Sequence, residues 1–408
     1  MKLKVVIWFA GIFGALSRLT GRGSGVMVTG RIILKLMPRA VATLSRERRV
    51  VLVTGTNGKT TTTSLVYNAL ATTSRTISNF TGANLFAGVA TALSQDARAK
   101  TVVLEVDELV LPWAITQTSP ELIVLLNLGR DQLDRLSEVR SVAQKWKDAL
   151  ASLPENCWIL GDADDPFVVW AAQDWPRVIW FSAGIAGHLD ASTCPVCGHV
   201  LVWSDGGNSY HCECGFKKPN PDWVLEENIL RGSHGEAIEV VSRIPGRAAL
   251  SNAARAIISA SMMGVPSAVA ANAVSMVTSV DGRFGELHIG ATTFRLLLSK
   301  NPASWRETLA TSSTSGPETV LLAVNANTQD GKDTSWLWDV DYSPLRGRVV
   351  FVTGERRIDV SARLTVNEIS HRLVNDELDA ARVIGDKNAD LIASYTAFHR
   401  LSKSVKRR

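Results

Sequence analysis

Short runs of aliphatic and β-branched residues recur along the chain, and each passes abruptly into polar residues. Four are "VVLVTGTNGKTTTT" from residue 50, "TVVLEVDE" from residue 101, "LIVLLNLGRDQLDR" from residue 122 and "WILGDADDPFV" from residue 158. Apolar runs of this length, separated by helical stretches such as 61–71, predict a parallel sheet that is buried on both faces. In such α/β sheets the functional residues gather at the carboxyl ends of the strands. We therefore expect Lys59, Glu105 and Asn127 to share one crevice.

The apolar pattern begins earlier, in "VVIWFAGIFGAL" from Val5 to Leu16. This run of about twelve residues is shorter than the roughly 20 that span a bilayer, and Arg18 and Arg22 follow it. It predicts a helix that packs on the protein or lies against a membrane surface.

Three further patterns divide the rest of the chain. Residues 190–222 interrupt the strand pattern with cysteines, glycines and prolines, and "IPGRAALSNAARAI" opens an alanine-rich helix. "SVDGRFGEL" from residue 279 has the composition of a hinge, and a second set of α/β patterns follows it. We therefore predict a basic segment over 1–48, a central α/β domain over 49–286 with an insertion at 190–222, and a C-terminal α/β domain over 287–408 that ends in a basic tail.

Composition and charge refine this outline. The chain has 408 residues, of which 46% are hydrophobic and 20% charged, so it can bury more than one core. The net charge of +5 is unevenly spread, since the first fifty residues hold ten Lys and Arg against one acid, Glu47. Basic ends indicate a polyanionic neighbour, either a membrane surface or a nucleic acid, unless they serve only solubility.

The segment from Gly55 to Thr61, which also contains Thr56, Asn57, Gly58, Lys59 and Thr60, has the order of a phosphate-binding loop. A strand, a glycine-rich turn, a Gly-Lys-Thr sequence and a helix follow one another, so backbone N–H groups would bind phosphate at a helix N-terminus. Lys59 would contact the β- and γ-phosphates of ATP, and Thr60 would bind Mg²⁺. The loop has two residues between its glycines, whereas the common P-loop has four.

Three carboxylates follow the second strand, and Mg²⁺ prefers such hard oxygen ligands. Glu105 is the expected second Mg²⁺ ligand, with Asp107 and Glu108 as alternatives. Any of the three could instead cap the following helix.

Four of the five cysteines lie in one window: Cys194, Cys197, Cys212 and Cys214. A CxxC–glycine turn and a second, shorter CxC–glycine turn predict a zinc ribbon, with His211 as an alternative ligand. Because four protein ligands leave no open position, we expect a structural role for the zinc.

With these motifs placed, the chain resembles the Mur ligase family over nearly its whole length. TGTNGKTTT, the strand that ends in Glu105, "GDADDP", the PGR…SNA helix, Gly282-Arg283 and "KNP" carry the resemblance. It implies a central ATPase domain with a parallel sheet and a P-loop, ATP contacts from Asn252 and Arg283, and catalysis by ATP-dependent phosphorylation of a carboxylate that an amine then attacks. The chain departs from many members at Gln132 and at Ala248-Ala249, and neither Lys145 nor Lys147 can be assigned as a carbamylated lysine.

Within the family, the chain is most similar to the MurT-type subunits of lipid II isoglutaminyl synthase. The short region before the ATP loop, the cysteine ribbon and "DGKDTSWLWDVD" carry this resemblance. It implies a cytoplasmic enzyme that amidates the D-glutamate α-carboxyl of the lipid II stem peptide with ammonia from a GatD-like glutaminase. It also implies that an aspartate of the last domain serves the partner's catalytic site. Asp339 is the first choice and Asp341 the second, and the two lie on the same strand face if the segment is extended.

Two other functions agree with parts of this sequence. A folylpolyglutamate-synthase-like ligase would act as a single chain on a free amino acid. A nucleic-acid-binding ATPase would need a continuous basic face around the ribbon, but Asp190 and Glu213 mix there with Lys217 and Lys218, so we expect no nucleic acid partner.

Overall fold

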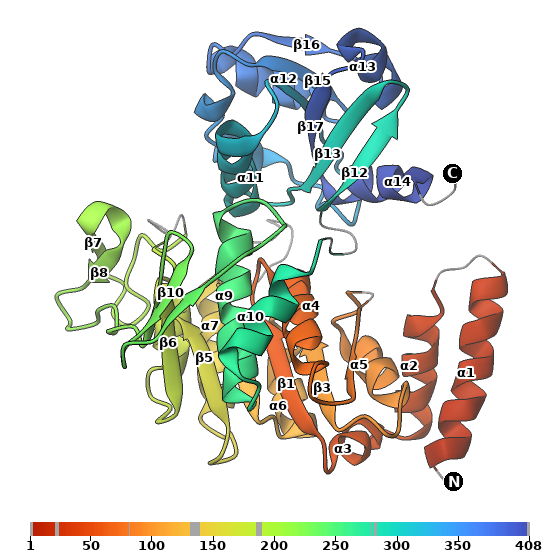
Figure 1. Cartoon of the computed structure of the whole chain (residues 1–408), viewed down its shortest axis with the longest axis vertical. Helices are drawn as coiled ribbons and strands as arrows, with labels where there is room; N and C mark the ends of the chain where they lie inside the picture. Colours follow the sequence, from red (N-terminus) through yellow and green to blue (C-terminus); the bar gives the residue numbers. More distant parts are fainter. Residues whose placement is uncertain are drawn as a thin grey trace. The chain divides into compact units, whose positions relative to one another are not determined.

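The computed structural model describes residues 3–20, 24–80, 82–130, 139–184, 190–278, 280 and 284–405. These residues form two compact units (Figure 1). The first unit comprises residues 1–129, 137–242 and 250–277, and the second comprises 130–136, 243–249 and 278–408.

The first unit is built on a nine-stranded sheet with the order β11-β10-β9-β6-β5-β4-β1-β3-β2. The strands from β9 to β2 in this order are parallel, and β10 and β11 add an antiparallel edge. Their bounds are β1 Arg49–Thr54, β2 Thr76–Ser78, β3 Thr101–Glu105, β4 Leu122–Leu125, β5 Trp158–Asp162, β6 Val178–Ser182, β9 Trp223–Glu226, β10 Ile229–Gly232 and β11 Ala237–Glu239.

Strand β1 shows why this sheet needs helices on both sides. Val50 and Leu52 belong to one hydrophobic core, and Val51 and Val53 belong to another. Alternate side chains of a strand point to opposite faces, so an unbroken aliphatic run must be covered twice. This confirms the parallel, doubly covered sheet that the hydrophobic pattern predicts.

The covering helices divide between the two cores. Helices α4 (Lys59–Leu70), α9 (Arg247–Met262) and α10 (Ser267–Ser275) contribute to the core that contains Val51 and Val53. The opposite core receives α3 (Ala40–Ser45), α5 (Phe86–Ser94), α6 (Leu111–Thr118), α7 (Val139–Leu150) and α8 (Pro166–Ala172).

Helices α1 (Leu3–Leu19) and α2 (Val26–Leu36) extend the first unit beyond α5, where Figure 1 shows the three side by side. Their packing is close because glycines line it: a Cβ on Gly14 would lie 2.2 Å from the Thr29 hydroxyl, and one on Gly30 would lie 1.8 Å from the Ala87 carbonyl oxygen. The helix predicted over Val5–Leu16 is therefore confirmed, and its inner face packs on the protein. Among the described helices, none combines the length and the apolar character that crossing a membrane requires.

The cysteine-rich insertion forms a small two-stranded antiparallel sheet of β7 (Val202–Ser204) and β8 (Ser209–His211). A 3-10 turn at Asp205–Gly207 joins the two strands.

The second unit has a six-stranded sheet with the order β12-β13-β17-β14-β15-β16, in which only the β12–β13 pair is antiparallel. The predicted C-terminal α/β patterns are confirmed as strands. Its elements are β12 Phe284–Ile289, β13 Thr292–Leu298, β14 Thr319–Ala323, β15 Val349–Thr353, β16 His371–Leu373, β17 Asn388–Ala393, α11 Pro302–Ser315, α12 Arg357–Val366, α13 Glu377–Ile384 and α14 Tyr395–Val405.

The aromatic segment before Asp339 is not extended, contrary to the condition set for pairing Asp339 with Asp341 on one strand face. It forms the 3-10 helix η2 (Ser335–Trp338), and a second one, η3 (Ser343–Leu345), follows. Trp336 is buried against Trp305, with ring centroids 6.2 Å apart, whereas Trp338 is exposed. The segment turns because one tryptophan fills the core of the unit and the other does not.

A buried ion pair joins the two central strands β13 and β17. Arg295 lies directly opposite Asp390 and binds both carboxylate oxygens, at 2.7 Å from Nε and 2.9 Å from Nη2. The Asp390 side chain is fully buried and also accepts a hydrogen bond from Ser312.

We expect Asp390→Ala to lower the free energy of unfolding by about 3–5 kcal/mol, because it removes the fully buried carboxylate and leaves the partly buried Arg295 guanidinium without its partner. Urea denaturation measures the change. The matched control is Arg382→Gln, which breaks the exposed Arg382–Asp379 pair and should cost at most about 1 kcal/mol. Equal losses in the two variants would show that burial of the pair does not matter.

Candidate functional site

The loop between β1 and α4 is pressed against the chain that follows β4. Gly55 and Gly58 both have positive φ angles, of 137° and 84°. A Cβ on Gly55 would lie 2.9 Å from the backbone nitrogen and oxygen of Asn127, and one on Gly58 would lie 2.8 Å from the Asn252 side-chain oxygen. Gly58 is the N-cap of α4 and supplies no side-chain cap, so phosphate oxygens can take that role. A side chain at Gly55 or Gly58 would therefore clash with the segment after β4 or with Asn252, and the glycines let the loop form a cradle of backbone N–H groups at the start of α4.

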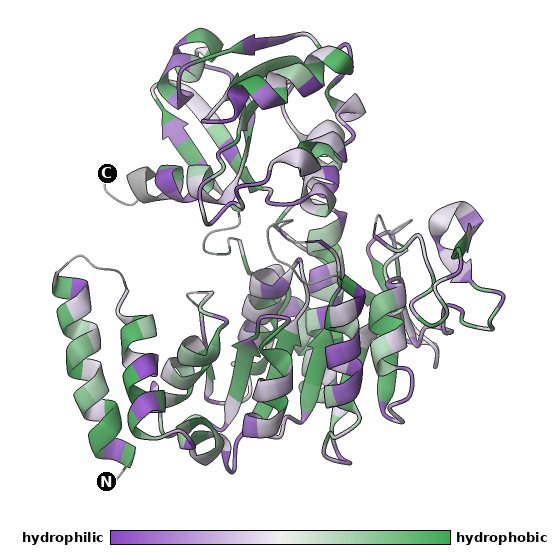
Figure 2. Cartoon of the chain, turned by 180° about the vertical axis from the view of Figure 1, so that it is seen from behind, coloured by the Kyte–Doolittle hydropathy of each residue, from purple (hydrophilic) through white to green (hydrophobic). Residues whose placement is uncertain are grey.

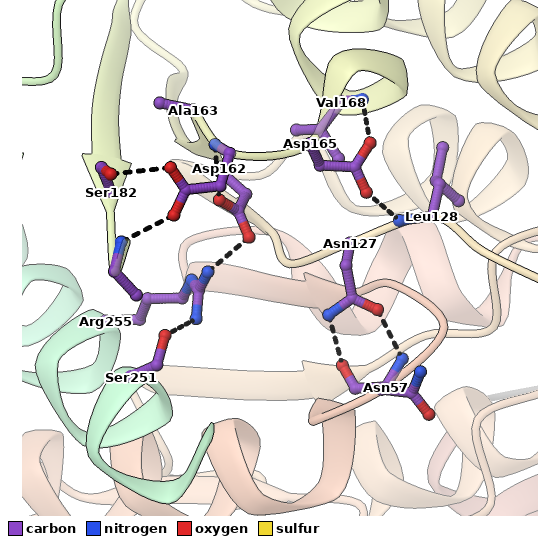
Figure 3. Close-up of polar contacts among 12 residues, drawn as sticks. Asn57, Asn127, Leu128, Asp162, Ala163, Asp165, Val168, Ser182, Ser251 and Arg255 are labelled. Carbon is purple, nitrogen blue, oxygen red and sulfur yellow. Dashed lines mark hydrogen bonds and ion pairs between the residues drawn. The ribbon is translucent and has the colours of Figure 1, made fainter. Parts of the chain in front are cut away.

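Asn127 holds this cradle in shape. Its side-chain oxygen accepts from the Asn57 N–H at 2.9 Å, its side-chain nitrogen donates to the Asn57 carbonyl at 3.1 Å, and its own carbonyl accepts from the Thr56 N–H at 2.8 Å. Figure 3 shows the paired bonds between the two asparagines. The structure places Asn127 against the phosphate loop, which these hydrogen bonds brace.

Lys59 is buried at the start of α4 and points back over the loop. Its ammonium donates to the carbonyls of Gly55 at 2.5 Å and Thr56 at 3.3 Å, and forms an ion pair with Glu108 at 3.0 Å. A buried ammonium held by carbonyls on one side and a carboxylate on the other is positioned without rotamer freedom. It is suited to neutralise charge on a phosphate in the cradle.

The three carboxylates after β3 have three different surroundings. Glu105 is buried, and its carboxylate accepts from Asn84 at 3.2 Å, while Asn79 binds the Glu105 backbone N–H and carbonyl. Glu108 pairs with Lys59, and Asp107 caps a turn by accepting from the Leu109 N–H at 3.0 Å. The buried carboxylate oxygens of Glu105 fit a divalent cation beside bound phosphates, and Thr60 lies in the first turn of α4, directly after Lys59.

A second polar cluster, which the sequence reading did not assign, lies where β5 ends. Arg255 of α9 donates to Asp162 at 2.5 Å and to Ser251 at 2.5 Å (Figure 3). Its guanidinium lies 4.6 Å from the Phe181 ring centroid. Burial raises the pKa of Asp162 to about 7, and the Arg255 guanidinium opposes that rise. The polar end of "WILGDADDP" is the signal in the sequence, but the arginine lies far away in the chain.

Asp165, three residues after Asp162 in the same turn, ties this cluster to the phosphate loop. One oxygen of Asp165 caps α8 by accepting from the N–H groups of Phe167 and Val168, and the other accepts from the Leu128 N–H at 2.7 Å. Leu128 follows Asn127 directly, so Asp165 helps to place the asparagine that braces the loop.

The ribbon cysteines converge as predicted. The sulfur atoms of Cys194, Cys197, Cys212 and Cys214 all lie within 4.8 Å of one another. Among the described residues, this group does not include His211, so the alternative ligand is not supported.

Two glycine turns explain how the two halves of the ribbon bring their cysteine sulfur atoms together. The Gly198 N–H donates to the Cys194 carbonyl at 2.9 Å, and the Gly215 N–H donates to the Cys212 carbonyl at 3.0 Å. The two halves therefore make equivalent glycine turns, although the second has one residue fewer between its cysteines. The His199 N–H lowers the pKa of Cys197 to about 7, toward the thiolate that binds zinc. Four thiols at this spacing fit a tetrahedral zinc ion.

The ribbon is attached to the acidic turn after β5. Lys218 forms an ion pair with Asp164 at 2.6 Å, and the Tyr210 hydroxyl donates to the Ala163 carbonyl at 3.1 Å. Asp164 also accepts from the Ser182 hydroxyl at 2.7 Å. The insertion therefore packs on the turn that follows β5. Through Asp165, this same turn contacts the segment that braces the phosphate loop.

Asp339 and Asp341 have different surroundings in the second unit. Asp341 uses both oxygens within its own turn, accepting from the Ser343 N–H at 2.9 Å and the Ser343 hydroxyl at 2.8 Å. Asp339 is about 43% exposed and forms an ion pair with Arg130 at 3.1 Å.

The other residues that the sequence analysis considers for the site divide into three groups. Asn252 lies beside Gly58, as an ATP contact would require, and Thr61 lies in the first turn of α4. Arg283 lies outside the described residues, as does Gln132. Lys147 pairs with Asp174, and Lys145 is exposed on the same helix, so neither gains a role.

We expect about one zinc ion per chain by elemental analysis. Cys194→Ser should remove the metal and lower the melting temperature, because a structural site contributes folding free energy. Cys157→Ser is the matched control, since this buried cysteine lies outside the ribbon and its loss should leave the zinc content unchanged. A wild-type chain that contains no zinc and is nevertheless fully stable would contradict the zinc assignment.

Comparison with known proteins agrees with this geometry. Residues 53–260 match the description "Mur ligase middle domain", and residues 298–398 match "MurT ligase C-terminal". Two relatives named as the MurT subunit of lipid II isoglutaminyl synthase come from Staphylococcus aureus and Streptococcus pneumoniae. The first is 27% identical over 86% of this chain and 85% of its own length, and the second is 28% identical over 94% and 92%. The solved MurF ligase of Thermotoga maritima in complex with ADP shares the fold, with a TM-score of 0.62, 17% identity and coverage of 90% of this chain and 82% of its own. Because a family match covers half of its residues, this chain belongs to the Mur ligase family.

Proposed function

We propose that this chain is the synthetase subunit of a glutamine-dependent enzyme that amidates the stem peptide of lipid II. It uses ATP to convert the D-glutamate α-carboxyl group to the amide of D-isoglutamine. The reaction belongs to peptidoglycan synthesis and takes place in the cytoplasm, at the inner face of the plasma membrane, where a lipid-linked substrate is accessible.

One structural observation carries the proposal of ATP chemistry. The two-glycine cradle, the buried Lys59 ammonium and the buried Glu105 carboxylate meet where β1 and β3 end. The named relatives, which are similar over most of both chains, support the choice of lipid II as substrate. The match to the MurT-type C-terminal region supports a two-subunit enzyme.

In the first step, an oxygen of the substrate carboxylate attacks the γ-phosphorus of ATP, and ADP leaves. Gly55 and Gly58 admit the phosphates close to the backbone, and Lys59 neutralises negative charge as it develops on the transferred group. Glu105 and Thr60 would hold the Mg²⁺ that supplies charge neutralisation on the phosphate oxygens.

In the second step, the nitrogen of ammonia attacks the acyl carbon, inorganic phosphate leaves, and the nitrogen loses a proton. We propose that the ammonia comes from a GatD-like glutaminase, which hydrolyses glutamine to glutamate. A glutaminase Cys–His pair commonly uses a third group that orients the histidine.

Asp339 is suited to supply that third group to the partner. Its carboxylate is half-exposed, whereas both Asp341 oxygens are engaged in a turn. Arg363 fixes the segment by donating to the carbonyls of Leu337 at 3.1 Å and Trp338 at 3.2 Å, and its guanidinium lies 4.3 Å from the Trp338 ring centroid. The exposed Trp338 beside Asp339 has the character of an interface anchor.

The proposal is tested by co-purifying the chain with a candidate glutaminase and assaying amidation of lipid II with glutamine and ATP. Product that requires both subunits and both reagents supports it. Ligation of a free amino acid by the single chain would favour a folylpolyglutamate-synthase-like activity instead.

We expect Lys59→Ala to lower the rate of ATP-dependent amidation by about 100-fold or more, because it removes positive charge from the transferring phosphate. The variant should keep the circular dichroism spectrum of the wild type. Lys100→Ala, which changes an exposed lysine outside the loop, is the control and should keep full activity. Near-normal amidation by Lys59→Ala would exclude the proposed role.

We expect Asp339→Asn to lower glutamine-driven amidation by about tenfold or more, while added ammonia restores most of the rate. Asp341→Asn is the control. Loss of this carboxylate should alter its own turn, so any change in the amidation rate should be the same with glutamine and with ammonia. If Asp339→Asn lowers the ammonia-driven rate as much as the glutamine-driven rate, Asp339 acts in the synthetase or in the fold, and the role in the partner's site is wrong.

A further inference from the structure

The outer face of helix α1 carries a continuous stripe of exposed apolar side chains. Trp8 is 68% exposed and Leu19 is 84% exposed. The stripe consists of Val5, Trp8, Phe9, Ile12, Phe13, Leu16 and Leu19. This spacing follows one face of a helix, so the side chains form a single surface along its whole length. In Figure 2, α1 (beside the label N) is green along most of its length.

The stripe is not the face by which α1 packs on the protein. That face consists of Val6, Ala10 and Gly14, which are buried. Gly14 lets α1 approach Gly25 and Thr29 at the beginning of α2. The helix is therefore apolar on its exposed face as well as on its packed face, whereas a surface helix of a water-exposed protein normally has a polar outer side.

The charged residues of α1 and α2 are all of one sign. Lys4 and Arg18, near the two ends of α1, are exposed, and α2 exposes Arg31 and Lys35. The first 46 residues contain eight Lys and Arg and no Asp or Glu. A partner for this surface must accept apolar side chains and provide negative charge.

We propose that α1 is an interfacial membrane anchor that lies flat on an anionic lipid bilayer. The stripe enters the boundary between headgroups and acyl chains, and the flanking lysines and arginines contact anionic headgroups. The orientation follows from the packing, because α1 is held along its side by α2 and its free face runs parallel to its axis.

A second copy of the chain fits this surface less well. A symmetric contact places the same patch on both subunits, which would bring two sets of Lys and Arg together with no acid between them. An anionic membrane satisfies both the apolar and the charged requirement.

The structure gives less support to the basic C-terminal tail as the membrane anchor. Arg400 forms an ion pair with Glu377 within the second unit. Residues 406–408 lie outside the described part of the chain.

The anchor also suits the proposed function, on which only this part of the inference rests. Helix α1 belongs to the same compact unit as the phosphate loop. Attachment of that unit to the membrane would confine the ATP site to the surface in which a lipid-linked carboxylate is embedded.

The test is vesicle flotation of the full-length chain with phosphatidylglycerol vesicles and with phosphatidylcholine vesicles, each at low and high salt. The wild type should float with the anionic vesicles. Trp8→Glu/Leu16→Glu should lower the bound fraction about tenfold or more, because two apolar side chains no longer enter the bilayer. Arg31→Gln/Lys35→Gln should weaken binding by about fivefold per charge and reduce its dependence on salt.

The matched control is Ile358→Glu/Val366→Glu, which has the same spacing on another helix and also changes exposed apolar residues, at 62% and 64% exposure. It should float like the wild type. Thermal unfolding checks that each variant is folded. If Trp8→Glu/Leu16→Glu is less stable than the wild type, Trp8→Gln/Leu16→Gln replaces it.

No flotation of the wild type at low salt would overturn the proposal. So would equal flotation of the wild type and the α1 variant, or a dimer in analytical ultracentrifugation that the α1 variant abolishes while vesicles bind neither protein.

A second assay separates this inference from the proposed reaction. With its glutaminase partner, Trp8→Glu/Leu16→Glu should amidate lipid II in detergent micelles at the wild-type rate but lose most activity on lipid II in vesicles. If the wild type floats but amidates no lipid II in either form, the anchor stands and the proposed function fails.

Discussion

The close approach of the phosphate loop to the segment after β4 is the constraint on which the site of the first unit depends. Gly55 has no room for a side chain because the backbone of Asn127 lies against it, and the Asn127 side chain forms two hydrogen bonds with Asn57. The cradle is therefore made by two neighbouring strands of the sheet. The loop has only two residues between its glycines. It keeps its shape because the segment that follows the neighbouring strand β4 forms hydrogen bonds with it.

This support continues outward through a chain of contacts. Asp165 holds the residue after Asn127, the neighbouring Asp164 holds Lys218, and Tyr210 of the ribbon binds the carbonyl between Asp162 and Asp164. An ion bound by all four thiols would leave no position for a substrate, so we expect the ribbon to have a structural role. The insertion is distant from the phosphate loop in sequence. It nevertheless packs against the acidic turn that helps to position this loop.

The two compact units carry different parts of the proposed reaction. The first holds the phosphate loop and the helical pair α1–α2, and the second presents Trp338 and Asp339 on a 3-10 helix that Arg363 fixes. Phosphate chemistry and membrane contact would then belong to one unit, and contact with an ammonia-producing partner to the other. Such a division allows each surface to be altered by mutation without changing the others.

The sequence by itself determined the buried strands of the sheet and the position of the glycine-rich loop between β1 and α4. Aliphatic runs that end in glycine, carboxylate or asparagine predict buried parallel strands, and the cysteine spacing predicts a shared metal site; both are local patterns with a direct physical meaning. Only the tertiary structure decided which carboxylate does what, since Glu105, Asp107 and Glu108 differ in their neighbours and not in their type. It also revealed Arg255 beside Asp162, the turn at Asp339 and the outward stripe of α1. Each of these depends on contacts between residues far apart in the chain, or on which side of a helix is covered, and no local pattern of residues contains that information.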